Sequence, residues 1–370
     1  MTLKYRAAVL HAAQKPMSIE TVTASALKPS DVLVQIRAAG LCHTDLEVIE
    51  GSLHYPLPIV LGHEAAGVVE KVGAAVRGIK PGDHVVLSWN PHCGHCFYCD
   101  RDAPILCEQY LGEGPKAMPF DGEGRLGLAD GRTLQQLMFL GSFGEYCIVA
   151  DQQAIAVPKE IPFDRACLIG CGVMTGVGAA LNLGAIANGD AVMVIGCGAV
   201  GLSAVQGARL AGAATIIAVD IDPAKLDLAR RLGATLGVNA SIDDAVAAGK
   251  RETGGRGVDV VIEAAGSTSA FRLTTEAVRP GGHLIWLGKI DVNKDVAFRW
   301  GSLMQEKRIR RSSYGNARPR RDFPLLARAY LDGSLMLDEL ISRRIKLEEI
   351  NEGFGALKRG ETIRSVVTFD

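Results

Sequence analysis

Short hydrophobic runs bounded by turn residues fill the first third of the chain. β-branched residues are enriched at 32–38, 66–72 and 84–87, and the segment KPGD at 80–83 is a turn signal before the third run. Runs of this length and composition predict strands. The pattern therefore indicates an irregular, mostly β region.

The pattern changes near Gly172, where short apolar runs begin to alternate with helical stretches rich in Ala and Leu. The predicted strands lie at 191–195, 216–219, 258–264 and 283–287, and the predicted helices at 200–211 and 223–232. Such alternation is typical of βαβ units and a parallel sheet. From about Arg318 the regularity is lost, and the last predicted strand lies at 364–369. This return segment is able to rejoin the first, β-rich part.

The composition fits a globular protein of two domains. The chain has 370 residues, 48% of them hydrophobic, and its 40 basic and 41 acidic residues give a formal net charge of −1. Balanced charge argues against a general electrostatic attraction to nucleic acid or anionic lipid, so we expect no nucleic-acid partner. The basic residues between Lys307 and Arg321 then belong to a solvated loop or to the neighbourhood of a cofactor phosphate rather than to a nucleic-acid arm.

Two uncharged stretches, 166–189 and 191–208, are long enough to raise the question of a membrane span. Glycines interrupt both stretches, and Asn, Ser or Gln residues occur in them, so we expect no membrane partner. Residues 1–16 contain no long apolar core and do not resemble a signal peptide. A cytoplasmic location is therefore expected.

The segment GCGAVG at 196–201 follows a predicted strand and opens a predicted helix, a context in which it predicts a dinucleotide site. Gly196 allows a tight turn, Gly198 lets a pyrophosphate approach the backbone, and Gly201 permits close helix packing. Asp220, 19 residues after Gly201, is placed to bind both ribose hydroxyls. A carboxylate there repels a 2′-phosphate and the next residue is Ile221, not Arg, so the sequence predicts NAD rather than NADP. A glycine-rich turn without a ligand is the alternative.

Four of the nine cysteines have the spacing C-x2-C-x2-C-x7-C, namely Cys93, Cys96, Cys99 and Cys107. Clustered thiols in a chain with no secretion signal more often bind metal or do chemistry than form a disulfide framework. Four thiolates on one short loop suit tetrahedral zinc and leave no coordination position open, which makes the role structural. An iron–sulfur cluster is the alternative metal site, although the fourth cysteine comes later than in the ferredoxin pattern. Unligated thiols are a further alternative.

A second, scattered set consists of Cys42, His63 and Cys171. Each residue alone has an ordinary interpretation, because cysteine is often a buried small hydrophobe and a lone histidine is usually structural. Their contexts, GLCHTD at 40–45, GHE at 62–64 and GCG at 170–172, favour a shared role. One His and two Cys can hold zinc and leave the fourth position to a substrate, which is the arrangement of a catalytic site.

Together with Asp220 and GETIRSVVTF at 360–369, these motifs resemble the zinc-dependent medium-chain alcohol dehydrogenases over essentially the whole chain. The long stretch between Cys107 and Cys171 is similar to that of the animal and glutathione-dependent branches. The resemblance implies an α/β fold in three segments: a GroES-like, β-rich catalytic domain at 1–172 with a structural zinc lobe at 90–110, a doubly wound Rossmann domain for NAD at 173–316, and a return segment at 317–370 that completes the catalytic domain. It also implies two zinc ions per chain and a homodimer, with a tetramer as the alternative.

The resemblance also implies roles for individual residues. Cys42, His63 and Cys171 match the catalytic zinc ligands. Asp45 matches the carboxylate that orients the histidine, Glu64 an acid that can swing onto the metal, and Thr44 the hydroxyl that takes the alcohol proton. The residues that match cofactor contacts are His43 and Arg364 at the pyrophosphate, Lys225 at the adenosine ribose, and Thr175 and Val200 near the nicotinamide.

The substrate side carries two departures from the family pattern. Glu47 stands where many members end the proton relay with a histidine, so either Glu47 or water accepts the proton. Leu53 replaces the acid with which the glutathione-dependent branch grips its thiol adduct. Trp89 matches an aromatic pocket wall, and with Leu53 it favours aromatic or longer-chain primary alcohols. We therefore expect reversible oxidation of such an alcohol to its aldehyde, with a thiol-adduct formaldehyde dehydrogenase as the alternative.

Overall fold

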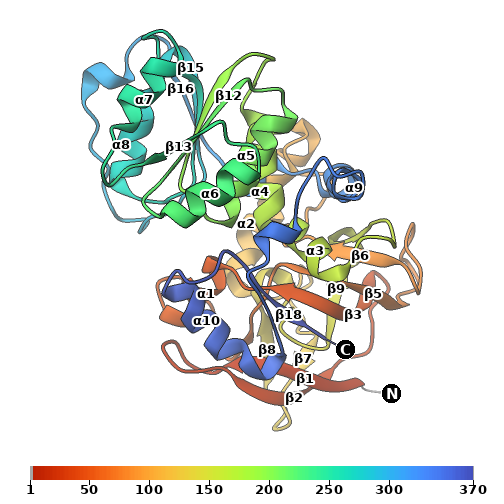
Figure 1. Cartoon of the computed structure of the whole chain (residues 1–370). Helices are drawn as coiled ribbons and strands as arrows, with labels where there is room; N and C mark the ends of the chain where they lie inside the picture. The colour runs from red at the N-terminus through yellow and green to blue at the C-terminus, as the bar shows by residue number, and fades with distance from the viewer. Residues whose placement is uncertain (1–2, 370) are drawn as a thin grey trace. The chain divides into compact units, whose positions relative to one another are not determined.

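The computed structural model describes residues 3–369, which form two compact units. The first unit consists of the chain up to Cys171 together with the chain from Arg318 onward, and the second unit is Gly172–Ala317 (Figure 1). Two crossings of the chain near Cys171 and Arg318 therefore connect the units.

The first unit contains a closed barrel, a larger sheet and five α-helices among its described residues. The barrel has the order β1–β2–β7–β8–β4, with β1 (Leu3–Leu10), β2 (Ser18–Ala24), β4 (Ile59–Val60), β7 (Leu126–Gly127) and β8 (Thr133–Gln136). The larger sheet has the order β10–β6–β5–β3–β18–β17, and β9 also pairs with β3. Its strands are β3 (Asp31–Gly40), β5 (Ala65–Val72), β6 (His84–Leu87), β9 (Tyr146–Ala150), β10 (Ala154–Ala156), β17 (Arg343–Ile345) and β18 (Ser365–Thr368). The helices are α1 (His43–Glu50), α2 (Glu108–Glu113), α3 (Phe163–Leu168), α9 (Pro319–Leu331) and α10 (Ile350–Lys358).

Strand β3 is the centre of the larger sheet. Eight of its ten residues are buried, and it pairs antiparallel with β5, β9 and β18. In the pairing with β18, Val366 lies opposite Gly40, so the return segment runs beside the end of β3. Buried residues of β3 belong to an apolar core that also includes Phe143 and Phe354, whose ring centroids are 5.8 Å apart. The chain that follows Gly40 therefore starts from a rigid, fully paired strand.

The second unit is a parallel sheet with the order β13–β12–β11–β14–β15–β16. This is the doubly wound order of a Rossmann domain. Its strands are β11 (Ala191–Ile195), β12 (Thr215–Asp220), β13 (Leu236–Asn239), β14 (Val258–Glu263), β15 (Val278–Trp286) and β16 (Arg308–Arg311). Its helices are α4 (Met174–Gly178), α5 (Ala199–Leu210), α6 (Pro223–Arg231), α7 (Ala245–Glu252) and α8 (Thr268–Ala277), of which α5 and α6 cover one face and α7 and α8 the other (Figure 1).

The sheet differs from the sequence prediction in two respects: β13 and β16 were not predicted, and one predicted strand begins earlier. The strand expected at 283–287 begins at Val278, because the stretch Val278–Gly282 continues the pairing with β14 through an irregularity near Val258. The glycines at 281 and 282 interrupt the hydrophobic run, so the sequence pattern did not predict this extension of the strand.

One continuous helical run, Phe163–Leu183, is long and apolar enough to cross a membrane by length and composition. However, 78% of its most apolar window is buried inside the protein. A core helix passes the same test, so the run is weak evidence for a membrane span. It includes two π-helical segments, Ile169–Val173 and Ala179–Leu183.

Candidate active site

Cys42, His63 and Cys171 lie together in the first unit, and their ligand atoms are all within 4.8 Å of one another. His63 Nε2 lies 3.4 Å from Cys171 Sγ. Tetrahedral zinc with bonds of about 2.0–2.3 Å separates a nitrogen and a sulfur ligand by roughly 3.6 Å. This separation is therefore close to that of a zinc site, and the three donors converge as such a site requires. Three protein ligands leave one position of the tetrahedron for another molecule.

The pairing of two strands brings Cys42 and His63 together. Cys42 follows the end of β3 and His63 precedes the start of β5, and Ala39 and Ala65 are partners in that antiparallel pair. Cys171 arrives from the π-helical segment after α3. Gly170 makes this approach possible, because a Cβ at that position would lie 2.9 Å from the carbonyl oxygen of Leu87.

Asp45 fixes the orientation of the histidine. Its Oδ1 lies 3.2 Å from His63 Nδ1 and accepts a hydrogen bond of 2.9 Å from the backbone N–H of Gly62. Its Oδ2 accepts a bond of 3.3 Å from the N–H of Cys42. With Nδ1 turned toward a carboxylate, Nε2 is the nitrogen left to bind a metal. Burial lowers the pKa of His63, but Asp45 and Cys42 outweigh burial and raise that pKa to about 10.

Glu64 and Arg364 form a buried ion pair beside these ligands. Their closest atoms, Glu64 Oε1 and Arg364 Nε, are 3.4 Å apart, with 0% and 4% of the side chains exposed. Arg364 also donates to the carbonyl of Leu41 at 2.8 Å. Burial lowers the pKa of Arg364, but Glu64 and the thiols Cys42 and Cys171 raise it by more, so the pKa is raised overall. The guanidinium therefore compensates negative charge at the ligand set.

A glycine is required for this arrangement. A Cβ at Gly40 would collide with the carboxylate of Glu64. The family role of Arg364 at a cofactor pyrophosphate stays a prediction.

The predicted proton-relay residues lie on α1, whose N-cap is Cys42. Thr44 and Glu47 are half-buried. His43, predicted as a contact of the cofactor pyrophosphate, lies on the same helix and is exposed. Leu53 and Trp89 are partly buried and pack against the core of the first unit.

Two tyrosines that the sequence analysis did not single out lie near the same site. The Tyr110 ring is 6.0 Å from that of Trp89 and 5.7 Å from that of Phe139. Burial raises the pKa of Tyr110, and the charges of Tyr55 and Cys171 add to this increase. Burial also raises the pKa of Tyr55, with a further contribution from Asp45. The positions of Tyr55 and Tyr110 in the sequence gave no sign that these side chains lie near Asp45 and Cys171.

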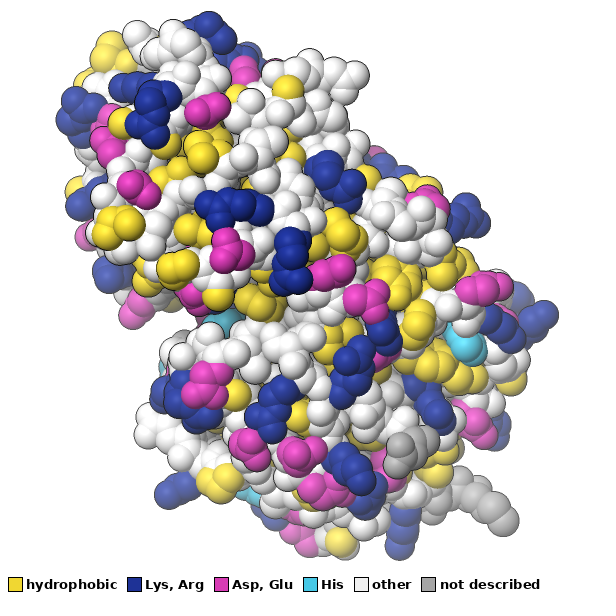
Figure 2. All heavy atoms as spheres, viewed as in Figure 1, with side chains coloured by type: hydrophobic (Ala, Val, Ile, Leu, Met, Phe, Trp, Pro, Cys, Tyr) yellow, Lys and Arg dark blue, Asp and Glu magenta, His cyan; other side chains and the backbone are white. Residues whose placement is uncertain are grey.

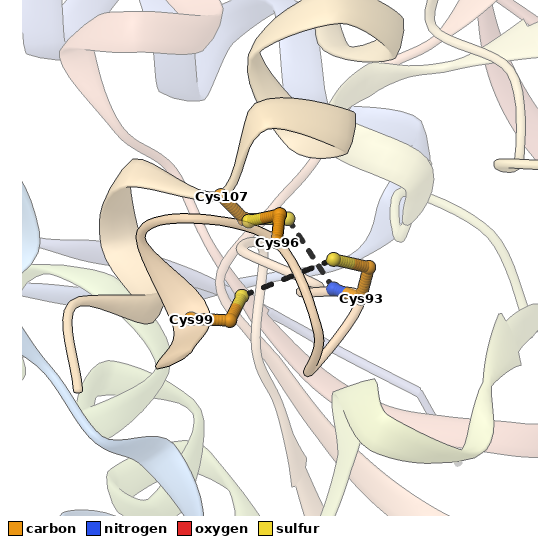
Figure 3. A group of neighbouring side chains, drawn as sticks. All are labelled: Cys93, Cys96, Cys99 and Cys107. Carbon is orange, nitrogen blue, oxygen red and sulfur yellow. Dashed lines mark hydrogen bonds between the residues drawn. The ribbon is translucent and has the colours of Figure 1, made fainter. Parts of the chain in front are cut away.

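The four-cysteine lobe is a second metal-binding geometry (Figure 3). The sulfurs of Cys93, Cys96, Cys99 and Cys107 lie within 4.8 Å of one another, and those of Cys93 and Cys99 are 4.0 Å apart. Tetrahedral zinc places two sulfurs roughly 3.8 Å apart. Cys107 Sγ also accepts a hydrogen bond of 3.2 Å from the N–H of Cys93 (Figure 3). Backbone N–H groups of Glu108 and Cys99 lower the pKa of Cys96 to about 6, whereas burial raises the pKa of Cys99 and that of Cys107.

The predicted dinucleotide turn lies between β11 and α5 in the second unit. Gly196 has a φ of 92°, and a Cβ there would lie 2.7 Å from the N of Ala265. A Cβ at Gly201 would collide with the carbonyl oxygen of Gly196. A Cβ at Gly198 would meet nothing within 4 Å, so this face of the turn is open. The geometry fits the approach of a pyrophosphate to the N-terminus of α5.

Three further predicted cofactor residues, Asp220, Lys225 and Thr175, belong to the same unit as this turn. Asp220 ends β12 and accepts a hydrogen bond of 2.6 Å from the N–H of Cys197. Lys225 is half-buried on α6. Thr175 lies on α4 beside Gly176, where a Cβ would collide with the carbonyl oxygen of Val200.

Glu263 is a further buried acid that the sequence analysis missed. It ends β14, is 0% exposed, and accepts hydrogen bonds from the N–H groups of Ala265 (2.9 Å), Gly266 (2.6 Å) and Gly288 (3.2 Å). Burial raises the pKa of Glu263, and the hydrogen bonds from these backbone N–H groups lower it by less, so the pKa is raised overall. Glu263 thus ties together the turns that follow β14 and β15.

Comparison with known proteins connects these sites to a family. Residues 28–159 match the alcohol dehydrogenase GroES-like domain, and residues 199–331 match the zinc-binding dehydrogenase domain. The S-(hydroxymethyl)glutathione dehydrogenase of Saccharomyces cerevisiae is 37% identical over 374 residues, which cover 100% of this chain and 97% of that protein. Two solved structures cover this chain and their own chains completely. They are an alcohol dehydrogenase zinc-binding domain protein from Burkholderia ambifaria (38% identity, TM-score 0.96) and the benzyl alcohol dehydrogenase of Acinetobacter calcoaceticus (30% identity, TM-score 0.94).

The fold and the matched domains define a zinc-binding dehydrogenase. The chain belongs to the zinc-dependent medium-chain alcohol dehydrogenases, a family of oxidoreductases that act on small-molecule alcohols. The predicted fold class, a GroES-like β-rich domain with a Rossmann domain, is confirmed.

Proposed function

We propose that this enzyme uses NAD, holds one catalytic and one structural zinc ion per chain, and reversibly oxidises an aromatic or longer-chain primary alcohol to its aldehyde. The convergence of Cys42, His63 and Cys171 within 4.8 Å carries the proposal, because it is a three-ligand set of the catalytic kind. The lobe of four cysteines, with all its ligands supplied by protein, supports a purely structural role for the second ion.

We assign different steps of the reaction to different residues at this site. A zinc ion held by the three ligands would supply Lewis-acid chemistry, which lowers the pKa of an alcohol hydroxyl. Asp45 keeps His63 turned with Nε2 toward the sulfurs. We assign acceptance of the hydroxyl proton to Thr44, followed by Glu47 or water. NAD would accept the hydride.

Asp220 supports NAD as the cofactor. Its carboxylate lies next to the glycine turn, bonded to the N–H of Cys197 at 2.6 Å. A negative charge at this place favours two ribose hydroxyls over a 2′-phosphate. Lys225, on the following helix, is the proposed partner of the adenosine ribose.

Apolar and aromatic side chains support the proposed substrate class. Leu53, Trp89 and Tyr110 are available to exclude water from an alcohol with an apolar body, and a benzyl alcohol dehydrogenase is among the similar structures. The competing function is oxidation of a thiol adduct, favoured by similarity to an S-(hydroxymethyl)glutathione dehydrogenase. Leu53 opposes it, because an apolar side chain cannot bind the polar carrier as an acid would.

We further propose a cytoplasmic enzyme that forms a homodimer, with a tetramer as the alternative. Six of the nine cysteines belong to the two metal-binding groups, which is typical of a chain from a reducing compartment rather than of a disulfide framework.

A panel of alcohols tests the proposed function. NADH formation is measured with ethanol, hexanol, benzyl alcohol, cinnamyl alcohol and cyclohexanol, each with and without glutathione, and with NADP in place of NAD. We expect thiol-independent turnover that is fastest with the larger primary alcohols and NAD. Formaldehyde is tested in the same two conditions. If none of the alcohols is oxidised, and formaldehyde is oxidised only when glutathione is present, the enzyme has the thiol-adduct function instead. Cys42→Ala is the control variant and should lose turnover while still binding NADH.

A further inference from the structure

A cavity of about 730 Å³ lies in the second unit, away from the dinucleotide turn. Its lining comes from the segments that precede β14 and β16, the first residues of β15, the ends of α7 and α8, and the 3-10 helix Trp300–Leu303. The dinucleotide turn follows β11 at the carboxyl edge of the same parallel sheet. The cavity is therefore at the opposite, amino edge. We name it the basic cavity, after its lining side chains Lys250, Arg256, Arg279, Arg299 and Lys307, with Glu276 the one acidic residue among them.

The positive charge of the basic cavity is only partly neutralised. Arg299 pairs with Glu276 at 2.6 Å, and Arg279 pairs with Asp259 at 2.6 Å. Lys250, Arg256 and Lys307 form no ion pair within 4.0 Å in the part of the chain from 3 to 369. Three cations thus remain for one cavity, although the whole chain has a net charge of −1. Figure 2 shows Lys and Arg side chains, with acidic ones between them, over α7 on one face of this unit.

Lys307 is one of the less exposed of these cations. It is half-buried and donates a hydrogen bond of 2.7 Å to the carbonyl of Thr275, at the end of α8. Burial lowers its pKa, Glu276 opposes this, and the like charges of Lys250 and Arg299 lower it further. Holding an ammonium group among other cations raises the free energy of the folded protein. A bound anion would remove that cost.

The backbone around the cavity is also unusual. Gln305 and Glu306 are consecutive non-glycine residues with positive φ, of 69° and 60°. Such conformations are unfavourable for residues with a side chain and persist where the surroundings enforce them. Here the carbonyl of Gln305 accepts a hydrogen bond of 2.8 Å from the N–H of Gly281, which holds the loop against the start of β15. Lys307 directly follows this constrained turn.

We propose that the basic cavity is a second binding site, for a small anion with several charges of the diphosphate type. Its volume lies within the range of about 300–1,000 Å³ typical of small-molecule sites. Arginine offers a planar pair of donors that matches phosphate oxygens, and lysine adds a point charge. The cations converge on one cavity instead of forming a stripe, which favours a small ligand over a nucleic acid. The site is independent of the proposed alcohol and cofactor.

Calorimetric titration of the zinc-loaded enzyme with pyrophosphate tests the site. The titration is made with and without saturating NADH, which covers the dinucleotide turn, at constant ionic strength set with KCl. We expect one pyrophosphate per chain in the presence of NADH. Arg256→Gln, an exposed position, and Lys307→Gln should each weaken binding about tenfold or more, since a charge-assisted hydrogen bond contributes on the order of 1.5–3 kcal/mol.

Arg231→Gln is the matched control, because Arg231 is an exposed cation on α6 of the same unit and does not line the cavity. It should bind pyrophosphate like the wild type. Binding that NADH abolishes, or equal affinity in the wild type and both cavity variants, would overturn the proposal. Thermal unfolding of each variant without ligand distinguishes a lost site from a lost fold.

Discussion

Asp45 and His63 form a fully buried pair: their closest atoms, Oδ1 and Nδ1, are 3.2 Å apart, and the side chains are 0% and 1% exposed. The same carboxylate oxygen accepts the N–H of Gly62, one residue before the histidine. Asp45 therefore holds both the ring and the backbone that carries it. A histidine ligand held in this way loses little freedom when it binds a metal.

Replacement of this carboxylate should weaken the catalytic metal site. Asp45→Asn keeps the shape but loses the charge that fixes His63, and we expect metal affinity or activity to fall about 10–100-fold. Zinc content after dialysis against a weak chelator, together with kcat, measures the effect. Asp130→Asn removes the charge of an exposed acid, paired with Arg132, and serves as the control. Full zinc retention and wild-type kcat in D45N would contradict this role of Asp45.

The four-cysteine lobe should lose its metal independently of the other site. Cys107 is 0% exposed, and its sulfur is one of four within 4.8 Å. In Cys107→Ser we expect zinc to fall from two ions per chain to one, with a lower Tm, because metal binding contributes directly to the folding of a structural site.

Metal analysis and thermal unfolding measure both effects. Cys167→Ala is the control, since Cys167 is a buried thiol outside both metal-binding groups, and it should keep two ions. Two ions in C107S would show that the lobe does not hold one of them.

Local patterns explain why parts of the fold were predictable. The strand, glycine turn and helix around Gly196 depend on neighbouring residues, and so does the position of Asp220 at the end of β12. The grouping of Cys42, His63 and Cys171 is not local, and it was predicted from the short motifs around each residue and from family resemblance. In the sequence, Cys171 comes 108 positions after His63, so spacing does not indicate that they meet.

The unpredicted parts are stabilised by contacts from distant segments. Strands β7 and β8 have two and four residues, too few for a hydrophobic pattern, and they exist because they complete the barrel. Strand β13, LGVN, is short and half-polar, and pairing with β12 stabilises it. The turn of Tyr110 toward Trp89 also depends on packing that the order of residues does not reveal.

The buried ion pair Asp31–Arg125 is another long-range feature, with partners 94 residues apart. Both side chains are 4% exposed, and Arg125 Nε lies 2.6 Å from Asp31 Oδ2. Arg125→Met should lower the free energy of unfolding by about 3–5 kcal/mol, because it leaves an uncompensated buried carboxylate. Arg132→Met, which breaks an exposed pair with Asp130, should change stability by about 0–1 kcal/mol. Denaturant unfolding measures both, and equal effects would contradict the assigned importance of burial.

Glu263 gives the sharpest test of how the sheet supports the cofactor site. One of its oxygens accepts the N–H groups of Ala265 and Gly266, and the other accepts that of Gly288. Ala265 lies directly against the dinucleotide turn, since a Cβ on Gly196 would come within 2.7 Å of its nitrogen. In Glu263→Gln, an amide group must replace one oxygen and would face an N–H donor. One of the two turns then loses its acceptor, at a cost of about 1–3 kcal/mol.

We expect the dissociation constant of NADH to rise about tenfold in this variant, because each factor of ten corresponds to about 1.4 kcal/mol. Fluorescence titration with NADH measures it. Zinc content should remain that of the wild type, because both metal-binding groups belong to the first unit and Glu263 belongs to the second. Glu252→Gln, an exposed acid on α7, is the control and should leave NADH binding unchanged. An unchanged dissociation constant in E263Q would mean that the turns after β14 and β15 keep their positions without the carboxylate. The apolar packing of the sheet would then be sufficient to hold the cofactor site.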